Sequence, residues 1–84
     1  MTTTAALIDT LAALSTDRVT VTATQRDHGL VASYVVHTDE ISVAEAIGAQ
    51  VSREIGDTMR AAGYRFVDAG GDDPGIYEVW TLDA

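Results

Sequence analysis

Residues 18–38 have the sequence RVTVTATQRDHGLVASYVVHT, and this stretch decides the fold. Over residues 18–24, valine or alanine alternates with threonine, which is the period-two pattern of a half-buried strand. Residues 30–38 form a second run rich in β-branched side chains. Between the runs, Asp27-His28-Gly29 supplies turn chemistry, because glycine accepts the positive φ of a tight hairpin. The stretch therefore predicts a β-hairpin.

The length of the hairpin loop decides which side chains share a face. A two-residue loop places Ala32, Tyr34 and Val36 on the face of Val19 and Val21, and it places residues 33, 35 and 37 on the threonine face. A three-residue loop would reverse this assignment.

Helices are predicted on both sides of this hairpin in the sequence. Residues 4–15 place leucines at positions 7, 11 and 14, the three- and four-residue spacing of an amphipathic helix. After the hairpin, Ser42-Val43-Ala44-Glu45 matches a capping box, which predicts a helix that begins at Val43. Its apolar residues recur at helical spacing up to Gly63, a natural C-terminal cap.

The rest of the chain predicts a second pair of strands, residues 64–68 and 76–82, joined by an irregular, glycine-rich loop over residues 69–75. The element order is α-β-β-α-β-β. We therefore expect one α+β domain over residues 1–84, with a four-stranded, mainly antiparallel sheet and two helices on one face. The last strand has apolar groups on both sides, so either Ile76, Trp80 and Leu82 or Tyr77 and Val79 must lie on the uncovered face.

The composition is strongly acidic, with 13 Asp and Glu against 5 basic residues and a formal net charge of -8. This charge repels phosphate backbones and anionic membrane surfaces, so we expect no direct nucleic-acid or membrane binding. The acidity indicates either adaptation to high salt or recognition of a basic partner. No apolar run is long enough to span a bilayer and no signal peptide is evident, so a cytoplasmic location is expected.

The residues that could support chemistry are few. His37 lies near Asp39 and Glu40, but no third ligand is evident, and His28 lies in a predicted turn, so we expect structural roles for both. The acidic loop around Asp72 does not have the spacing of an EF-hand, and Gly70-Gly71 is not followed by a helix that could bind phosphate. We expect no catalytic residue, cofactor or metal.

Two surfaces are predicted to take part in association. Small residues recur every four positions along the second helix at Gly48, Ser52 and Gly56. These residues either pack within the chain or form a contact between chains. Val35, on the open sheet face, is also expected to take part in self-association. The other surface is the last hairpin, which is predicted to be an aromatic and acidic site that binds a protein partner with a basic surface. Its expected partner-binding residues are Asp68, Asp72, Asp73, Tyr77, Glu78, Trp80 and Asp83.

We therefore expect a small, acidic, non-enzymatic protein-interaction module that forms a homodimer and acts as an inhibitor or nucleic-acid mimic. One alternative is a small ligand-binding protein or enzyme with a pocket around His37, formed with Tyr34 or Asp39, between helix and sheet or at a dimer interface. A second alternative is a structural subunit of a homo-oligomer.

Overall fold

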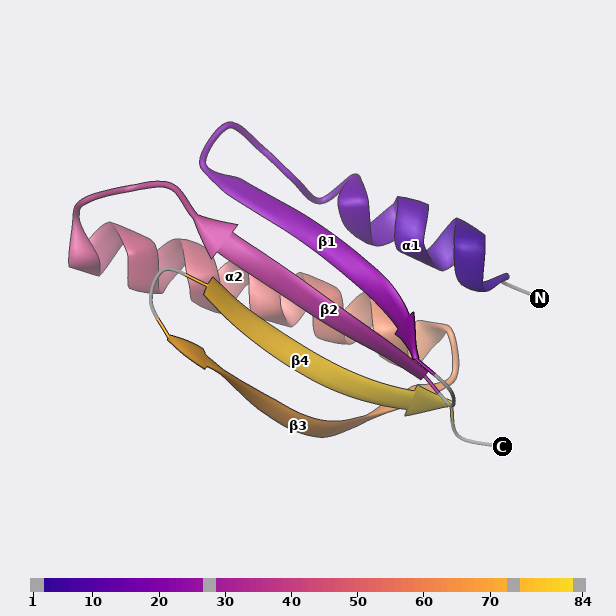
Figure 1. The fold of residues 1–84 in the computed structure, drawn as a ribbon. Helices are drawn as coiled ribbons and strands as arrows, with labels where there is room; N and C mark the ends of the chain where they lie inside the picture. The colour runs from indigo at the N-terminus through magenta and orange to yellow at the C-terminus, as the bar shows by residue number, and fades with distance from the viewer. Residues whose placement is uncertain (1–2, 27–28, 73–74, 83–84) are drawn as a thin grey trace.

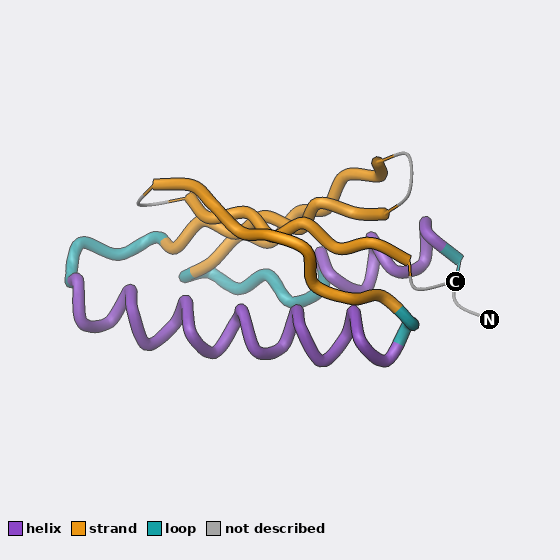
Figure 2. Tube along the Cα trace, turned by 90° about the horizontal axis from the view of Figure 1, so that it is seen from below, coloured by secondary structure: helices purple, strands orange, loops and turns teal. Residues whose placement is uncertain are grey.

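The computed structural model describes residues 3–26, 29–72 and 75–82. Its elements are α1 (Thr4–Ala12), β1 (Val19–Arg26), β2 (Gly29–Val36), α2 (Ile41–Ala61), β3 (Tyr64–Asp72) and β4 (Gly75–Leu82). The strands form one antiparallel sheet in the order β1-β2-β4-β3. Both helices lie on the same side of this sheet, and none of the described elements covers the other side (Figures 1 and 2). The predicted α+β architecture is thus confirmed.

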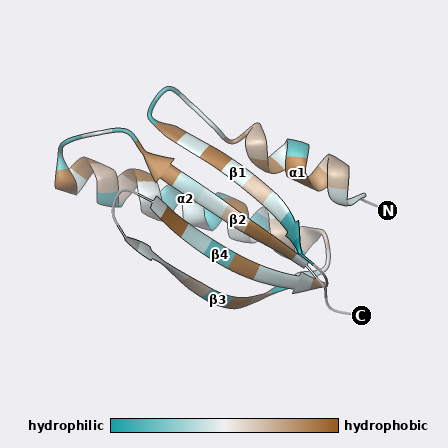
Figure 3. Cartoon of the chain, viewed as in Figure 1, coloured by the Kyte–Doolittle hydropathy of each residue, from teal (hydrophilic) through white to brown (hydrophobic). Residues whose placement is uncertain are grey.

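The first hairpin has the register that a two-residue loop gives. Arg26 pairs with Gly29 and Val21 pairs with Tyr34, so the alternation predicted from the sequence is confirmed. The valine face is buried under the helices, and the threonine face is the open one. Figure 3 shows the resulting alternation of apolar and polar residues along β1.

The core lies between the sheet and the two helices. It contains twelve buried apolar residues: Leu7, Leu11, Val19, Val21, Leu30, Ala32, Tyr34, Val36, Val51, Ile55, Met59 and Trp80. α1 packs along β1, and α2 packs across β2 and β3. Because α1 contributes only Leu7 and Leu11 to the buried set, most of the helical side of the core comes from α2.

The outer edge of β1 is covered by the segment that follows α1. The Ser15 hydroxyl accepts a hydrogen bond from the Val21 amide at 2.8 Å and donates one to the Val21 carbonyl at 3.2 Å. Next to it, the Thr16 amide donates to the Val19 carbonyl at 2.8 Å. These bonds satisfy outward-facing backbone groups that an edge strand would otherwise offer to another chain.

α2 does not begin with the predicted capping box. The helix starts at Ile41 with Glu40 as N-cap, and no side chain caps it. The Thr38 hydroxyl instead accepts a hydrogen bond from the Glu40 amide at 3.3 Å, and the Glu40 carbonyl accepts the first helical bond, from Ala44, at 2.9 Å. The predicted end is correct, because Gly63 has a φ of 89° directly after the last turn.

The loop predicted over residues 69–75 is also wrong, because β3 continues through Gly70 and Gly71 to Asp72. β3 contains a bulge: Phe66 pairs with Trp80 and Asp68 pairs with Val79, so Val67 is the additional residue. The bulge changes the alternation of the strand, which places Asp68 on the open face. Gly70 pairs with Tyr77 and leaves room for its ring, since a Cβ there would lie 2.5 Å from the Tyr77 hydroxyl oxygen.

Candidate functional site

β4 presents different chemistry to the two sides of the sheet. Its Trp80 is 2% exposed and its Glu78 is 5% exposed, and both face the helices. Tyr77 is 40% exposed on the open face. Burial therefore removes Glu78 and Trp80 from the predicted partner-binding set, because neither side chain is accessible in the folded chain.

The Glu78 carboxylate is the centre of a buried polar network. Its Oε2 accepts a hydrogen bond from the Ser52 hydroxyl at 2.6 Å, and its Oε1 accepts one from the Trp80 indole N–H at 3.2 Å. Within the described residues, no buried side-chain nitrogen or oxygen lacks a partner. Both carboxylate oxygens are thus used internally, which accounts for a charged residue in the core.

The row of small residues on α2 lies over this network. Gly48 is next to the Tyr34 ring, Ser52 binds Glu78, and Gly56 leaves space for the Arg60 guanidinium. That guanidinium lies 5.6 Å from the centre of the Trp80 ring, and Phe66 packs edge-on against the same ring at 5.4 Å. Packing within the chain, which was one of the two interpretations of this row, therefore accounts for all three positions.

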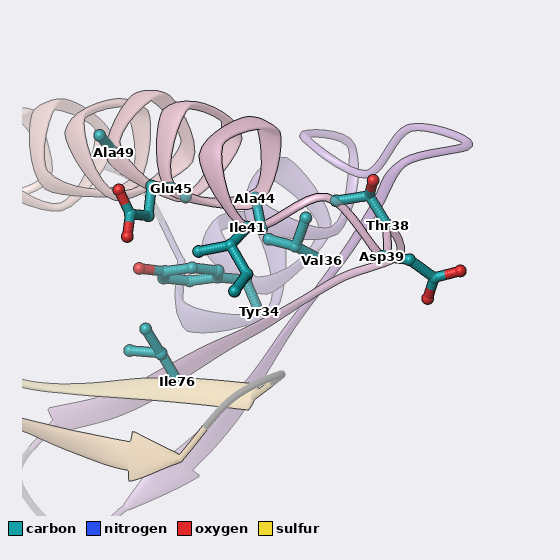
Figure 4. A pocket seen from close by; sticks show the side chains of 10 residues that line it. Tyr34, Val36, Thr38, Asp39, Ile41, Ala44, Glu45, Ala49 and Ile76 are labelled. Atoms are coloured by element: carbon teal, nitrogen blue, oxygen red, sulfur yellow. The ribbon is translucent and has the colours of Figure 1, made fainter.

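An apolar cavity of about 310 Å³ opens between the first half of α2, the end of β2 and the start of β4. Figure 4 shows the Tyr34 ring lying between α2 and Ile76, with Ile41 beside it. The lining residues are Tyr34, Val36, Thr38, Asp39, Ile41, Ala44, Glu45, Gly48, Ala49 and Ile76. Ile41 is 75% exposed, the largest exposure among the large apolar residues described. The cavity therefore combines an apolar floor with an apolar side chain at its mouth.

The rim of the cavity is acidic. Asp39 and Glu45 line it, and Glu40 precedes Ile41 in the chain. Within the described residues the structure shows a single ion pair, between Arg60 and Asp57 at 3.6 Å, so no cation neutralises the rim. In Figure 4 the carboxylate of Asp39 points away from the Tyr34 ring, so its charge lies outside the apolar floor.

His37 does not belong to this cavity, although Tyr34 and Asp39, its two predicted companions, both line it. Its Nε2 lies 2.7 Å from the Thr20 hydroxyl, and Thr20 is on the open face. The cavity between helix and sheet is thus centred on Tyr34 and not on His37. Within the described part of the chain, no three His, Asp or Glu side chains lie close enough together to hold a metal ion.

Of the predicted acidic partner-binding residues, the structure describes the side chains of Asp68 and Glu78, and these two lie apart. Asp68 is exposed on the open face, whereas Glu78 is buried on the opposite one. The backbone of Asp72 belongs to β3, but its side chain lies outside the description, as do Asp73, Asp83 and the predicted turn residue His28. The described acids that line the cavity are Asp39 and Glu45; the sequence indicated Asp39, as a companion of His37, but not Glu45. The signal that could have found them is Ile41, a large apolar residue directly after two acids.

Ionisation of the Tyr34 hydroxyl makes the stability of the fold decrease at alkaline pH. Burial, and then the nearby Glu78 carboxylate, raise its pKa above the ordinary value of 10.0, while the hydrogen bond with Ser52 lowers it. Because the folded state holds the neutral phenol, its contribution is complete below pH 10 and is lost as the pH rises through the folded pKa. We expect the urea midpoint to fall above about pH 10 and the fall to be smaller in Tyr34→Phe. An equal fall in both proteins would contradict this assignment.

Comparison with known proteins adds no relative: no family model, curated protein or solved structure matches the chain. Neither described helix combines the length and the hydropathy that a membrane span requires.

Proposed function

We propose that the chain is a protein-interaction module that binds a basic partner at the cavity between α2, β2 and β4. An apolar side chain of the partner enters the cavity, and its Arg or Lys neighbours lie against Asp39, Glu40 and Glu45. The observation that carries this proposal is the combination of an apolar floor with an acidic rim that lacks internal ion pairs among the described residues. A net charge of -8 accelerates the encounter with a cationic surface.

The mouth of the cavity favours a protein over a small molecule as the occupant. A volume of about 310 Å³ is at the lower end for ligand pockets and holds one or two side chains. Ile41 extends the apolar surface beyond the cavity, because it is 75% exposed. A small ligand that filled the cavity would leave this side chain in water, whereas a partner surface would cover it.

The rim charges and the floor contribute differently to this binding. Each exposed ion pair contributes roughly 0.2 to 1 kcal/mol, so the acids mainly set the rate of encounter and the choice of partner. Desolvation of Ile41 and Ile76 provides the larger part of the affinity. Filling the cavity should therefore weaken binding more than neutralising one acid does.

Binding of a synthetic amphipathic helix of leucine and lysine, followed by fluorescence anisotropy, tests the proposal. We expect Ala49→Leu, which places a larger side chain at the cavity, to weaken binding about tenfold or more. Glu45→Gln should weaken it about two- to fivefold, and this difference should disappear in molar salt.

Two matched variants and one matched probe serve as controls. Ala46→Leu makes the same change at an exposed position of α2 that does not line the cavity, and Glu54→Gln removes the same charge farther along the helix. Both should bind like the unmodified protein, and a leucine and glutamate peptide should not bind. Equal loss in Ala49→Leu and Ala46→Leu would show that the cavity is not the binding site.

A further inference from the structure

The open face of the sheet has an apolar centre that the helices leave uncovered. Tyr77 and Val79 of β4 lie beside Val31, Ser33 and Val35 of β2, which we call the open-face patch. Together with Arg26, four of these residues line a shallow groove of about 540 Å³: Val31, Ser33, Tyr77 and Val79. The Tyr77 ring lies across Gly70 of the edge strand, so the patch reaches β3. Figure 2 shows that no helix lies on this side.

The open face also differs from the rest of the surface in charge. Among the side chains that the structure describes, its strands carry Arg26, Arg65 and a single carboxylate, Asp68. The other described carboxylates lie on the helices, on the connections next to them or, for Glu78, in the buried layer. The open face is thus the part of this acidic chain where negative charge is nearly absent.

From this distribution we infer that the open face binds a second copy of the same chain, giving a dimer in which two sheets pack face to face. Two copies at a net charge of -8 repel each other, and contact through a helical surface would bring acid against acid. Contact through the two open faces avoids this repulsion and buries the apolar centre of both copies. It forms a two-layer sandwich with a helical layer on each outer side.

The open face is large enough for such a dimer. Four strands of eight or nine residues span roughly 27 Å by 19 Å, on the order of 500 Å² on each copy. Two copies together would bury on the order of 1,000 Å², which is the lower bound for a specific interface. The dimer leaves the cavity next to Ile41 free, so it is independent of the proposed function.

Sedimentation equilibrium of the unmodified chain and of two matched variants tests this inference. We expect the unmodified chain to sediment at twice its mass of 8.9 kDa. Tyr77→Asp should raise the dissociation constant of the dimer about a hundredfold, because each copy would then place a carboxylate in an interface that excludes water. Ile41→Asp makes a comparable change outside the open face and should leave the dimer intact. Circular dichroism shows whether each variant is folded.

A dilution series of the unmodified protein, followed by amide chemical shifts, locates the contact without a substitution. The signals of β2 and β4 should move on dilution, and those of α1 and α2 should stay in place. A monomer at every concentration would overturn the inference, and would indicate that the face is solvated or serves a different protein. A dimer whose shifts map to the helices, or one that Tyr77→Asp leaves unchanged, would overturn it as well.

Discussion

Replacement of Glu78 by alanine is expected to remove about 3 to 4 kcal/mol from the free energy of unfolding. The alanine leaves the Trp80 indole N–H without its acceptor in the core, and it removes the acceptor of the Ser52 hydroxyl. It also leaves a void where a buried side chain was. A domain of 84 residues has a total stability of about 4 to 12 kcal/mol, so this loss is a large fraction of it.

Glu78→Gln is the matched variant for this prediction. Its amide oxygen can accept from Trp80, and its amide nitrogen can donate to the Ser52 oxygen, so the shape and both contacts remain. We expect a loss of about 1 kcal/mol or less. Urea denaturation followed by fluorescence is a direct measurement, because Trp80 is the only tryptophan in the chain. Equal midpoints for Glu78→Ala and the unmodified protein would show that the network does not stabilise the fold.

The sequence predicts those parts of the fold whose cause is local. The alternation over residues 18–24 gives the buried face of β1, because a side-chain period of two has a single geometric meaning in a strand. Gly63 gives the end of α2, because the residue after a helix often takes a positive φ.

The errors arise where contacts made in the folded chain override a local pattern. Ser42 and Glu45 fulfil the capping pattern, but the Glu40 carbonyl already accepts the first helical bond, so the helix begins earlier. Gly70 and Gly71 have weak strand propensity, yet β4 holds them in the sheet, and the Tyr77 ring occupies the space that a side chain at Gly70 would need. The local patterns that led to these two predictions do not show which of these contacts the folded chain makes.

The candidate site is the least predictable part for the same reason. Glu78 is charged, so its position in the last hairpin suggests an exposed acid. Its partner Ser52 lies 26 positions earlier, on α2. The cavity takes its lining from α2, β2, β4 and the connection before α2, so its residues share no spacing that could have identified it. What the sequence does provide is the net charge and the period of each element, and these are sufficient to predict an uncovered sheet face.

Replacement of Gly29 by alanine is expected to remove about 2 to 3 kcal/mol of stability, although only one methyl group is added. The sequence suggests that this glycine serves a turn, but it is the first residue of β2, and it pairs with both Arg26 and Thr81. A Cβ at this position would overlap the Trp80 carbonyl oxygen and lie 2.8 Å from the Thr81 Cα. Both are backbone atoms of β4, so β2 and β4 must separate at this end.

The same substitution at Gly48 should have the opposite sign. A Cβ there would lie 3.6 Å from the Tyr34 ring, an ordinary van der Waals contact, and alanine is favoured over glycine in a helix interior by about 1 kcal/mol. Thermal unfolding of the two variants should therefore give transition temperatures on either side of that of the unmodified protein. If Gly29→Ala has the same transition temperature as Gly48→Ala, β2 and β4 do not approach each other as closely as the contacts at Gly29 require. The register that separates the buried face from the open face would then have to shift at this end of the sheet.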